Sequence, residues 1–123
     1  MSTASLTRVA IVDADRRVQS SLAEVLRAAG VTVVGTAGDV RGALELIEDH
    51  AASVLVIDPR LPELDAGQAL LSSIRLRWPE VRVVLMGWAD PSEGGELTTA
   101  APYVTKSALP EDFVSATVAA CNC

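Results

Sequence analysis

The clearest indication of the fold is the sequence of residues 53–67, SVLVIDPRLPELDAG. Its unbroken apolar run, residues 54–57, is typical of a strand buried on both faces, as in a parallel sheet covered by helices. Pro59 and Pro62 then end the strand, because a proline cannot donate a ladder hydrogen bond and restricts the residue before it. Asp58 is therefore left at the carboxyl end of a buried strand, the edge where open α/β sheets bind ligands. Capping of a turn is the alternative role for a carboxylate at this place.

The length and composition of the chain indicate one domain. A chain of 123 residues buries roughly two-thirds of its unfolded surface, so we expect a single domain over residues 1–123 with a core over about residues 7–120. Half of the residues are apolar but only 3% are aromatic, which predicts an aliphatic core. No apolar run reaches about 18 residues and no signal-peptide pattern is present, so we expect a cytoplasmic protein without a membrane segment.

The charges and the single histidine argue against several classes of protein. A formal net charge of -6 argues against direct contact with nucleic acid, which requires clustered Lys and Arg. His50 is predicted to lie exposed at the end of a helix, where neither a hydrolytic triad nor a pair of metal-binding histidines can be assembled around it. We therefore expect no enzymatic activity.

Strands and helices alternate five times along the sequence. We predict strands at residues 8–12, 31–35, 53–57, 81–86 and 102–106, each followed by a segment of helical periodicity. Asp15 and Asp39 are placed to cap the first two helices, and Leu76 and Val118 are among the residues predicted to face the core. The alternation implies a single parallel sheet with helices on both faces, because a parallel crossover needs a covering helix.

The fourth helix, expected between residues 87 and 100, is predicted to be short and mobile. Gly94 and Gly95 together cost such a helix about 2 kcal/mol relative to alanine. We therefore expect fast amide exchange between Pro91 and Thr99.

Three charged residues stand at the carboxyl ends of predicted strands: Asp13, Asp58 and Lys106. The predicted fold is a flavodoxin-like, doubly wound parallel sheet of order 2-1-3-4-5, an order taken from known folds of this class. In that order, strands one, three and five bring the three side chains around one crevice.

Three spaced motifs resemble one protein family over nearly the whole chain, from Arg8 to about Ala120. They are Ile11-Val12-Asp13 before a helix, Asp58-Pro59-Arg60-Leu61-Pro62 with Asp65 beyond, and Tyr103-Val104-Thr105-Lys106 before a helix. In order and approximate spacing the sequence is similar to the receiver domain of two-component response regulators. The residues after Lys106 look like those of receivers that precede a helix-turn-helix output domain. Because none follows here, we expect a stand-alone receiver or a fragment of a longer protein.

The resemblance implies a site of phosphoryl transfer. Asp58 would be the acceptor of a phosphoryl group from a histidine kinase, a phosphotransfer protein or a small phosphodonor. Lys106 would neutralise the phosphoryl oxygens, because this chemistry depends on positioning and on positive charge. In the unmodified chain, a salt bridge from Lys106 to Asp13 or Asp58 is also expected.

The resemblance also implies Mg²⁺ as a cofactor, with one departure. Family members usually carry two adjacent acids after the first strand, and the second of these positions is Ala14 here. Mg²⁺ prefers an octahedral shell of oxygens. The remaining candidate ligands are Asp13, Asp58 and the backbone carbonyl of Arg60, so we expect weak binding. Asp15 is expected to point toward the helix cap instead.

A second departure concerns the switch that the resemblance implies. In the family, a Thr or Ser hydroxyl at the end of the fourth strand moves toward the phosphoryl group, and an aromatic residue on the fifth strand turns inward. Tyr103 matches the aromatic residue, but Gly87 replaces the hydroxyl residue and Trp88 follows it. We therefore expect an uncoupled switch. Trp88 either lids the site or covers surface left by the short fourth helix.

Three classes of function remain open from the sequence. We favour a phosphoaccepting signalling receiver in a phosphorelay, which meets its downstream protein partner through the face of the fourth helix, fifth strand and fifth helix. The alternatives are a degenerate receiver that binds partners without phosphorylation, and a small enzyme or ligand binder on the same fold, since a fold does not fix function. A homodimer is left open.

Overall fold

The computed structural model describes residues 7–88 and 101–121. Its elements are β1 (Val9–Val12), α1 (Arg16–Ala28), β2 (Val33–Ala37), α2 (Val40–Glu48), β3 (Val54–Ile57), α3 (Leu64–Arg77), β4 (Arg82–Gly87), β5 (Tyr103–Thr105) and α5 (Pro110–Cys121). The short fourth helix was predicted between residues 87 and 100 and its mobility between Pro91 and Thr99, and residues 89–100 lie outside the described residues. Within the described ranges, no helix has the length and apolar character that a membrane crossing requires.

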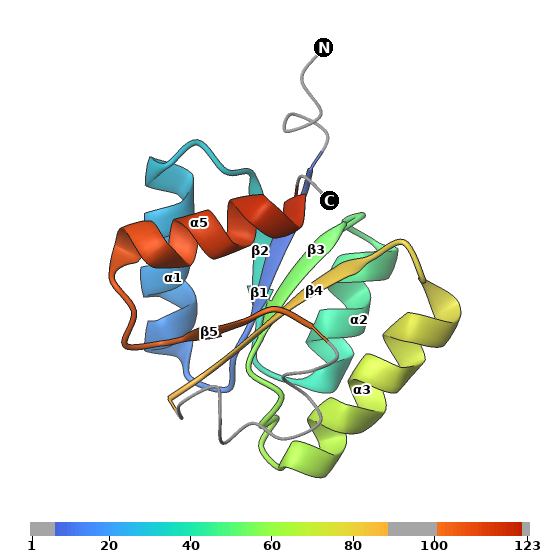
Figure 1. Cartoon of the computed structure of the whole chain (residues 1–123). Helices are drawn as coiled ribbons and strands as arrows, with labels where there is room; N and C mark the ends of the chain where they lie inside the picture. Colours follow the sequence, from blue (N-terminus) through green and yellow to red (C-terminus); the bar gives the residue numbers. More distant parts are fainter. Residues whose placement is uncertain (1–6, 89–100, 122–123) are drawn as a thin grey trace.

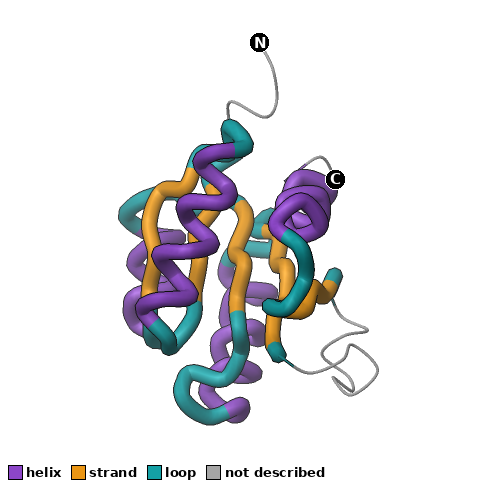
Figure 2. The backbone as a smooth tube through the Cα atoms, turned by 90° about the vertical axis from the view of Figure 1, so that its left-hand side faces the viewer, coloured by secondary structure: helices purple, strands orange, loops and turns teal. Residues whose placement is uncertain are grey.

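The five strands form one parallel sheet in the order β2-β1-β3-β4-β5. Helices α1 and α5 cover one face of the sheet, and α2 and α3 cover the other (Figure 1). Figure 2, turned by 90°, looks onto the face that α1 and α5 cover. The predicted flavodoxin-like, doubly wound sheet and its strand order are therefore confirmed.

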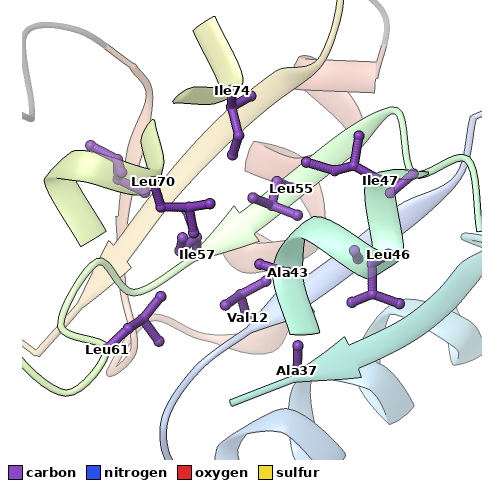
Figure 3. Close-up of a cluster of buried hydrophobic side chains, with 13 residues drawn as sticks. Val12, Ala37, Ala43, Leu46, Ile47, Leu55, Ile57, Leu61, Leu70 and Ile74 are labelled. Carbon is purple, nitrogen blue, oxygen red and sulfur yellow. The ribbon is translucent and has the colours of Figure 1, made fainter. Parts of the chain in front are cut away.

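Alternate residues of each central strand face opposite helix layers. In β3, Leu55 and Ile57 belong to the cluster packed against α2 and α3 (Figure 3), whereas Val54 and Val56 belong to the cluster under α1 and α5. All four side chains are at most 1% exposed. Since burial of one such side chain stabilises the fold by about 1.5–3 kcal/mol, this strand anchors both layers and holds Asp58 at its end.

Aspartates cap the first two helices as predicted. Asp15 accepts a hydrogen bond from the Arg17 amide at 2.8 Å, and Asp39 accepts one from the Gly42 amide at 2.7 Å. Each cap of this kind contributes about 1 kcal/mol. Because Asp15 begins α1 only three residues after β1 ends, its cap also fixes the short connection at the sheet edge.

Two residues predicted to face the core are exposed instead. Leu76 is 84% exposed and Val118 is 37% exposed. In α3 the side chains of Leu70 and Ile74 pack on the sheet, and Leu76 lies about 200° further around the helix than Ile74. In α5 the side chain of Thr117 faces the sheet, and Val118, the next residue, is therefore turned about 100° away from it.

Candidate functional site at the carboxyl edge of the sheet

The sheet brings the three predicted charged residues together at its carboxyl edge. The Asp58 amide donates to the Val12 carbonyl at 2.9 Å, so Asp13 and Asp58 leave neighbouring strands side by side. On the next strands, the Lys106 amide donates to the Gly87 carbonyl at 2.8 Å. From there the Lys106 side chain reaches both acids.

One ammonium bridges the two carboxylates. The Nζ atom of Lys106 lies 2.7 Å from Oδ2 of Asp58 and also forms an ion pair with Oδ2 of Asp13. The side chains of Lys106, Asp13 and Asp58 are 5%, 3% and 10% exposed, so water screens these contacts little. Lys106 is also the only lysine in the sequence. With two carboxylates and one ammonium, the cluster carries a formal charge of -1.

Backbone amides hold the other two carboxylate oxygens. Oδ1 of Asp13 accepts a hydrogen bond from the Asp15 amide at 2.8 Å, and Oδ1 of Asp58 accepts one from the Arg60 amide at 3.0 Å. Each acid thus has one oxygen on a backbone amide and one on Lys106. The carboxylate of Asp15 serves the helix cap, as predicted, and is not a member of the cluster.

The two acids also set the protonation state of Lys106. Burial alone lowers the pKa of this ammonium, because it disfavours the charged form. The hydrogen bonds and charges of Asp13 and Asp58 outweigh burial and raise the pKa above its ordinary value of 10.5. Lys106 is therefore a fixed positive charge at neutral pH.

The residues at this edge do not form a ready metal site. The residue after Asp13 is Ala14, which has no ligand atom in its side chain, and no group of three His, Cys, Asp or Glu in the described part of the chain could hold a metal ion. Each oxygen of Asp13 and Asp58 already contacts a protein donor. A Mg²⁺ ion, which requires such oxygens as ligands, must therefore compete with Lys106 for them.

The two residues predicted for the switch are in contact. A Cβ atom added to Gly87 would lie only 2.7 Å from the Tyr103 hydroxyl. The hydroxyl of this half-buried tyrosine therefore occupies the space that any side chain at position 87 would fill. Tyr103 packs against the cluster under α2 and α3.

Trp88 lies beside the site without closing it. Its ring centroid is 5.4 Å from Nζ of Lys106, and the residue is 65% exposed. A cation–π contact at such an exposed ring contributes about 0.5–1 kcal/mol. Trp88 thus contributes to the environment of Lys106 while most of its own surface remains in solvent.

One residue near the site was missed by the sequence analysis. Gln19, on α1, is 9% exposed, and its side-chain Nε2 donates to the backbone carbonyl of Asp13 at 2.6 Å. The available signal was its helical spacing with Ala23 and Leu26, the two other buried residues of α1, which places a polar residue on the buried face.

Comparisons with known proteins agree on one family. The sequence profile described as response regulator receiver domain matches residues 9–117. The transcriptional regulatory protein PdtaR of Mycobacterium tuberculosis is 31% identical over 111 residues, which cover 89% of this chain and 54% of that protein. The chain therefore spans about half the length of this curated relative.

Solved structures give the same result for the fold. The signal receiver domain of the putative response regulator NarL from Mycobacterium tuberculosis superposes with a TM-score of 0.81 at 26% identity, covering 94% of this chain and 96% of that one. The receiver domain of NtrX from Brucella abortus has a TM-score of 0.82 at 24% identity, covering 93% and 98% of the two chains.

Proposed function

This chain belongs to the family of response regulator receiver domains, and from that membership we propose that Asp58 accepts a phosphoryl group in a phosphorelay. The observation that carries the proposal is the bridge from Lys106 to Asp58 Oδ2 at a buried strand end. It supplies an acid nucleophile and a fixed positive charge 2.7 Å apart. Such a pair is what phosphoryl transfer needs, since charge stabilisation and positioning provide most of the catalysis.

In the proposed reaction, a carboxylate oxygen of Asp58 attacks the phosphorus of a phosphohistidine in line with the leaving nitrogen. An O–P bond forms, the N–P bond breaks, and the electron pair of that bond leaves with the imidazole. The product is an aspartyl phosphate. Lys106 moves from the carboxylate to a phosphoryl oxygen and keeps its ion pair with Asp13, so the buried ammonium stays paired throughout.

A receiver domain implies a histidine kinase or a phosphotransfer protein as its partner. We further propose that a downstream protein meets the chain at the face that contains β5 and α5. Receiver domains are generally non-enzymatic signalling domains, so no separate catalytic activity is proposed. A degenerate receiver that works without phosphorylation is not favoured, because the acid pair and the lysine are assembled in this chain.

The test of the proposal is phosphorylation of Asp58. Purified protein is incubated with acetyl phosphate or phosphoramidate, with and without Mg²⁺, and the acid-labile, hydroxylamine-sensitive phosphoprotein is measured by intact mass. We expect incorporation in the unmutated chain, and complete loss in Asp58→Asn. The matched control is Asp65→Asn, which removes an exposed acid in the first turn of α3. Absence of incorporation from these donors and from a purified phosphotransfer protein would contradict the proposal.

Receiver domains typically bind Mg²⁺ at their acidic pocket, and for this chain we propose weak binding by Asp13, Asp58 and the Arg60 carbonyl. The ion lacks a ligand at position 14 and competes with Lys106. We therefore predict that Ala14→Asp strengthens Mg²⁺ affinity, whereas Ala14→Asn, of similar size but without charge, has a smaller effect. Titration of tryptophan fluorescence or amide chemical shifts measures this. Submillimolar affinity in the unmutated chain would contradict the prediction.

A further inference from the structure

Gln19 is a buried polar residue that the proposed chemistry does not use. It is 9% exposed on the sheet-facing side of α1, among apolar side chains. A polar group in such a place costs stability unless it is hydrogen-bonded. Its Nε2 donates to the backbone carbonyl of Asp13 at 2.6 Å.

This hydrogen bond falls at the residue where the chain leaves the sheet. The Asp13 amide still donates to the Ala37 carbonyl of β2 at 2.9 Å, and the Val12 carbonyl still accepts from the Asp58 amide. The carbonyl of Asp13 lies beyond the last paired residue of β1 and accepts from Gln19 instead. The Gln19 side chain of α1 therefore holds the peptide that connects Asp13 to Ala14.

That peptide belongs to the connection that also holds the Asp13 carboxylate. The amide that holds Oδ1 of Asp13 belongs to Asp15, two residues further along the same connection. Rotation of the peptide after Asp13 would carry Asp15 away and release this oxygen. The second oxygen pairs with Lys106, so a shift of Asp13 would also change how the ammonium is shared with Asp58.

A second connection of the chain lies close to the buried Gln19 amide. A Cβ atom on Gly38, in the connection after β2, would lie 3.1 Å from Nε2 of Gln19 and 3.5 Å from the Asp13 carbonyl oxygen. The Gln19 amide and the Asp13 carbonyl therefore both lie close to Gly38.

We propose that Gln19 is a positioning residue, which sets the Asp13 carboxylate and through it the place of Lys106 relative to Asp58. Its predicted effect on phosphorylation rests on the proposed function of Asp58, but its effect on the Asp13–Asp15 connection does not. No contact of Gln19 with the phosphoryl group is involved.

The test compares two buried hydrogen bonds from a side chain to the backbone. Gln19→Met keeps the length of the side chain and removes the donor, and Gln19→Glu keeps its shape but cannot donate when ionised. The control is Thr117→Val, which removes the hydrogen bond from a fully buried hydroxyl to the Phe113 carbonyl in α5. Urea unfolding is measured for every variant, so that an effect of global stability is recognised.

Two readouts follow the site itself. The first is the NMR spectrum, in which we follow the exchange rate and chemical shift of the Asp15 amide and the side-chain ¹⁵N resonance of Lys106. Lysine labelling gives a single signal for Lys106, because the chain has one lysine. The second is the rate of phosphorylation by acetyl phosphate. Misplacement of a reacting group by about 1 Å costs up to 100-fold in reaction rate. We therefore expect the rate of phosphorylation to fall about tenfold in both Gln19 variants and less than about twofold in Thr117→Val.

The expected result is faster exchange of the Asp15 amide and a shifted Lys106 signal in the Gln19 variants alone. Equal changes in Thr117→Val would overturn the proposal, since Gln19 would then act only through stability. If the Gln19 variants do not fold, the test uses the unmutated chain. A scalar coupling across the hydrogen bond from Gln19 Nε2 to the Asp13 carbonyl then supports the proposal, and free rotation of the Gln19 side-chain amide refutes it. A chain that accepts no phosphoryl group contradicts the proposed function, and the Asp15 and Lys106 signals still decide the role of Gln19.

Discussion

Lys106→Met is expected to lower the free energy of unfolding by about 3 kcal/mol near neutral pH, because removal of one partner from a buried ion pair leaves uncompensated charge. Here the variant leaves two carboxylates, on Asp13 and Asp58, that are 3% and 10% exposed and face each other without the ammonium. Urea unfolding at pH 7 measures the loss. Lys106→Arg, which keeps the charge, is expected to lose less.

The control is an ion pair on the surface. Arg77 lies 2.6 Å from Glu48, with side chains that are 53% and 46% exposed. Arg77→Met is expected to cost less than about 1 kcal/mol, because solvent screens the pair. Adding Asp13→Asn to Lys106→Met should recover part of the lost stability, since it removes one of the two opposed charges. Equal losses of unfolding free energy in Lys106→Met and Arg77→Met would show that the buried bridge contributes no more to stability than the surface ion pair.

The same bridge predicts how stability depends on pH at the alkaline end. The folded-state pKa of Lys106 is raised above 10.5, so its contribution is fully present below pH 10.5 and is lost as the pH rises through the raised pKa. This pH-dependent contribution to the free energy of unfolding is absent in Lys106→Met. Because the chain contains a single lysine, the difference between the two unfolding curves above pH 10.5 reports on this one group.

Gly87→Thr is expected to move the Tyr103 side chain away from position 87 of β4. The new side chain begins with a Cβ atom 2.7 Å from the Tyr103 hydroxyl, which is too close for both groups to remain where they are. The tyrosine ring can rotate whereas the strand backbone cannot, so we expect Tyr103 to become exposed. A ¹⁹F label on the tyrosine gives one signal, since the chain has a single tyrosine. Gly87→Ala separates the steric effect of the Cβ atom from that of the hydroxyl.

Beryllofluoride with Mg²⁺, a mimic of the phosphorylated acid, then tests coupling to Asp58. A ligand shifts a conformational equilibrium only through its different interactions with the two states. Each hydrogen bond to a charged phosphoryl oxygen contributes about 1.5–3 kcal/mol, and Gly87 has no side chain to make one. We expect Tyr103 to respond to beryllofluoride in Ala14→Asp/Gly87→Thr and hardly at all in the unmutated chain. A full response of the unmutated chain would refute the uncoupled switch.

The five strands and the acids at the ends of the first and third could be predicted because each depends on a short stretch of sequence, whereas the strand order that brings Asp13 and Asp58 together was taken from known folds of this class. The run before Asp58 is apolar at every position, so it fits only a strand covered on both faces. Strand β2 was predicted at residues 31–35 but spans Val33–Ala37, because Gly30 ends the preceding helix with a φ of 86° and the next residues form a connection. Strand boundaries of this kind depend on pairing with β1, which the sequence does not display.

The contacts that were missed join residues far apart in the sequence. The space over Gly87 is filled by Tyr103 of the neighbouring strand, and no local pattern indicates which residue fills the space beside a glycine. Gln19 interrupts an apolar helix face, but its partner is a backbone carbonyl that carries no sequence signature. The exposure of Leu76 likewise depends on how α3 is rotated on the sheet, which the residues of that helix do not determine alone.

The burial of the only lysine has a practical consequence for mapping complexes. Amine-reactive cross-linkers and lysine acylating reagents attack the neutral amine of an accessible ε-amino group. Lys106 offers neither property, because its side chain is 5% exposed and its ammonium is paired with Asp13 and Asp58. Mapping of this domain with the proposed kinase partner therefore calls for carboxylate-directed or photoactivated reagents, for which exposed acids such as Glu45 and Glu48 on α2 provide attachment points.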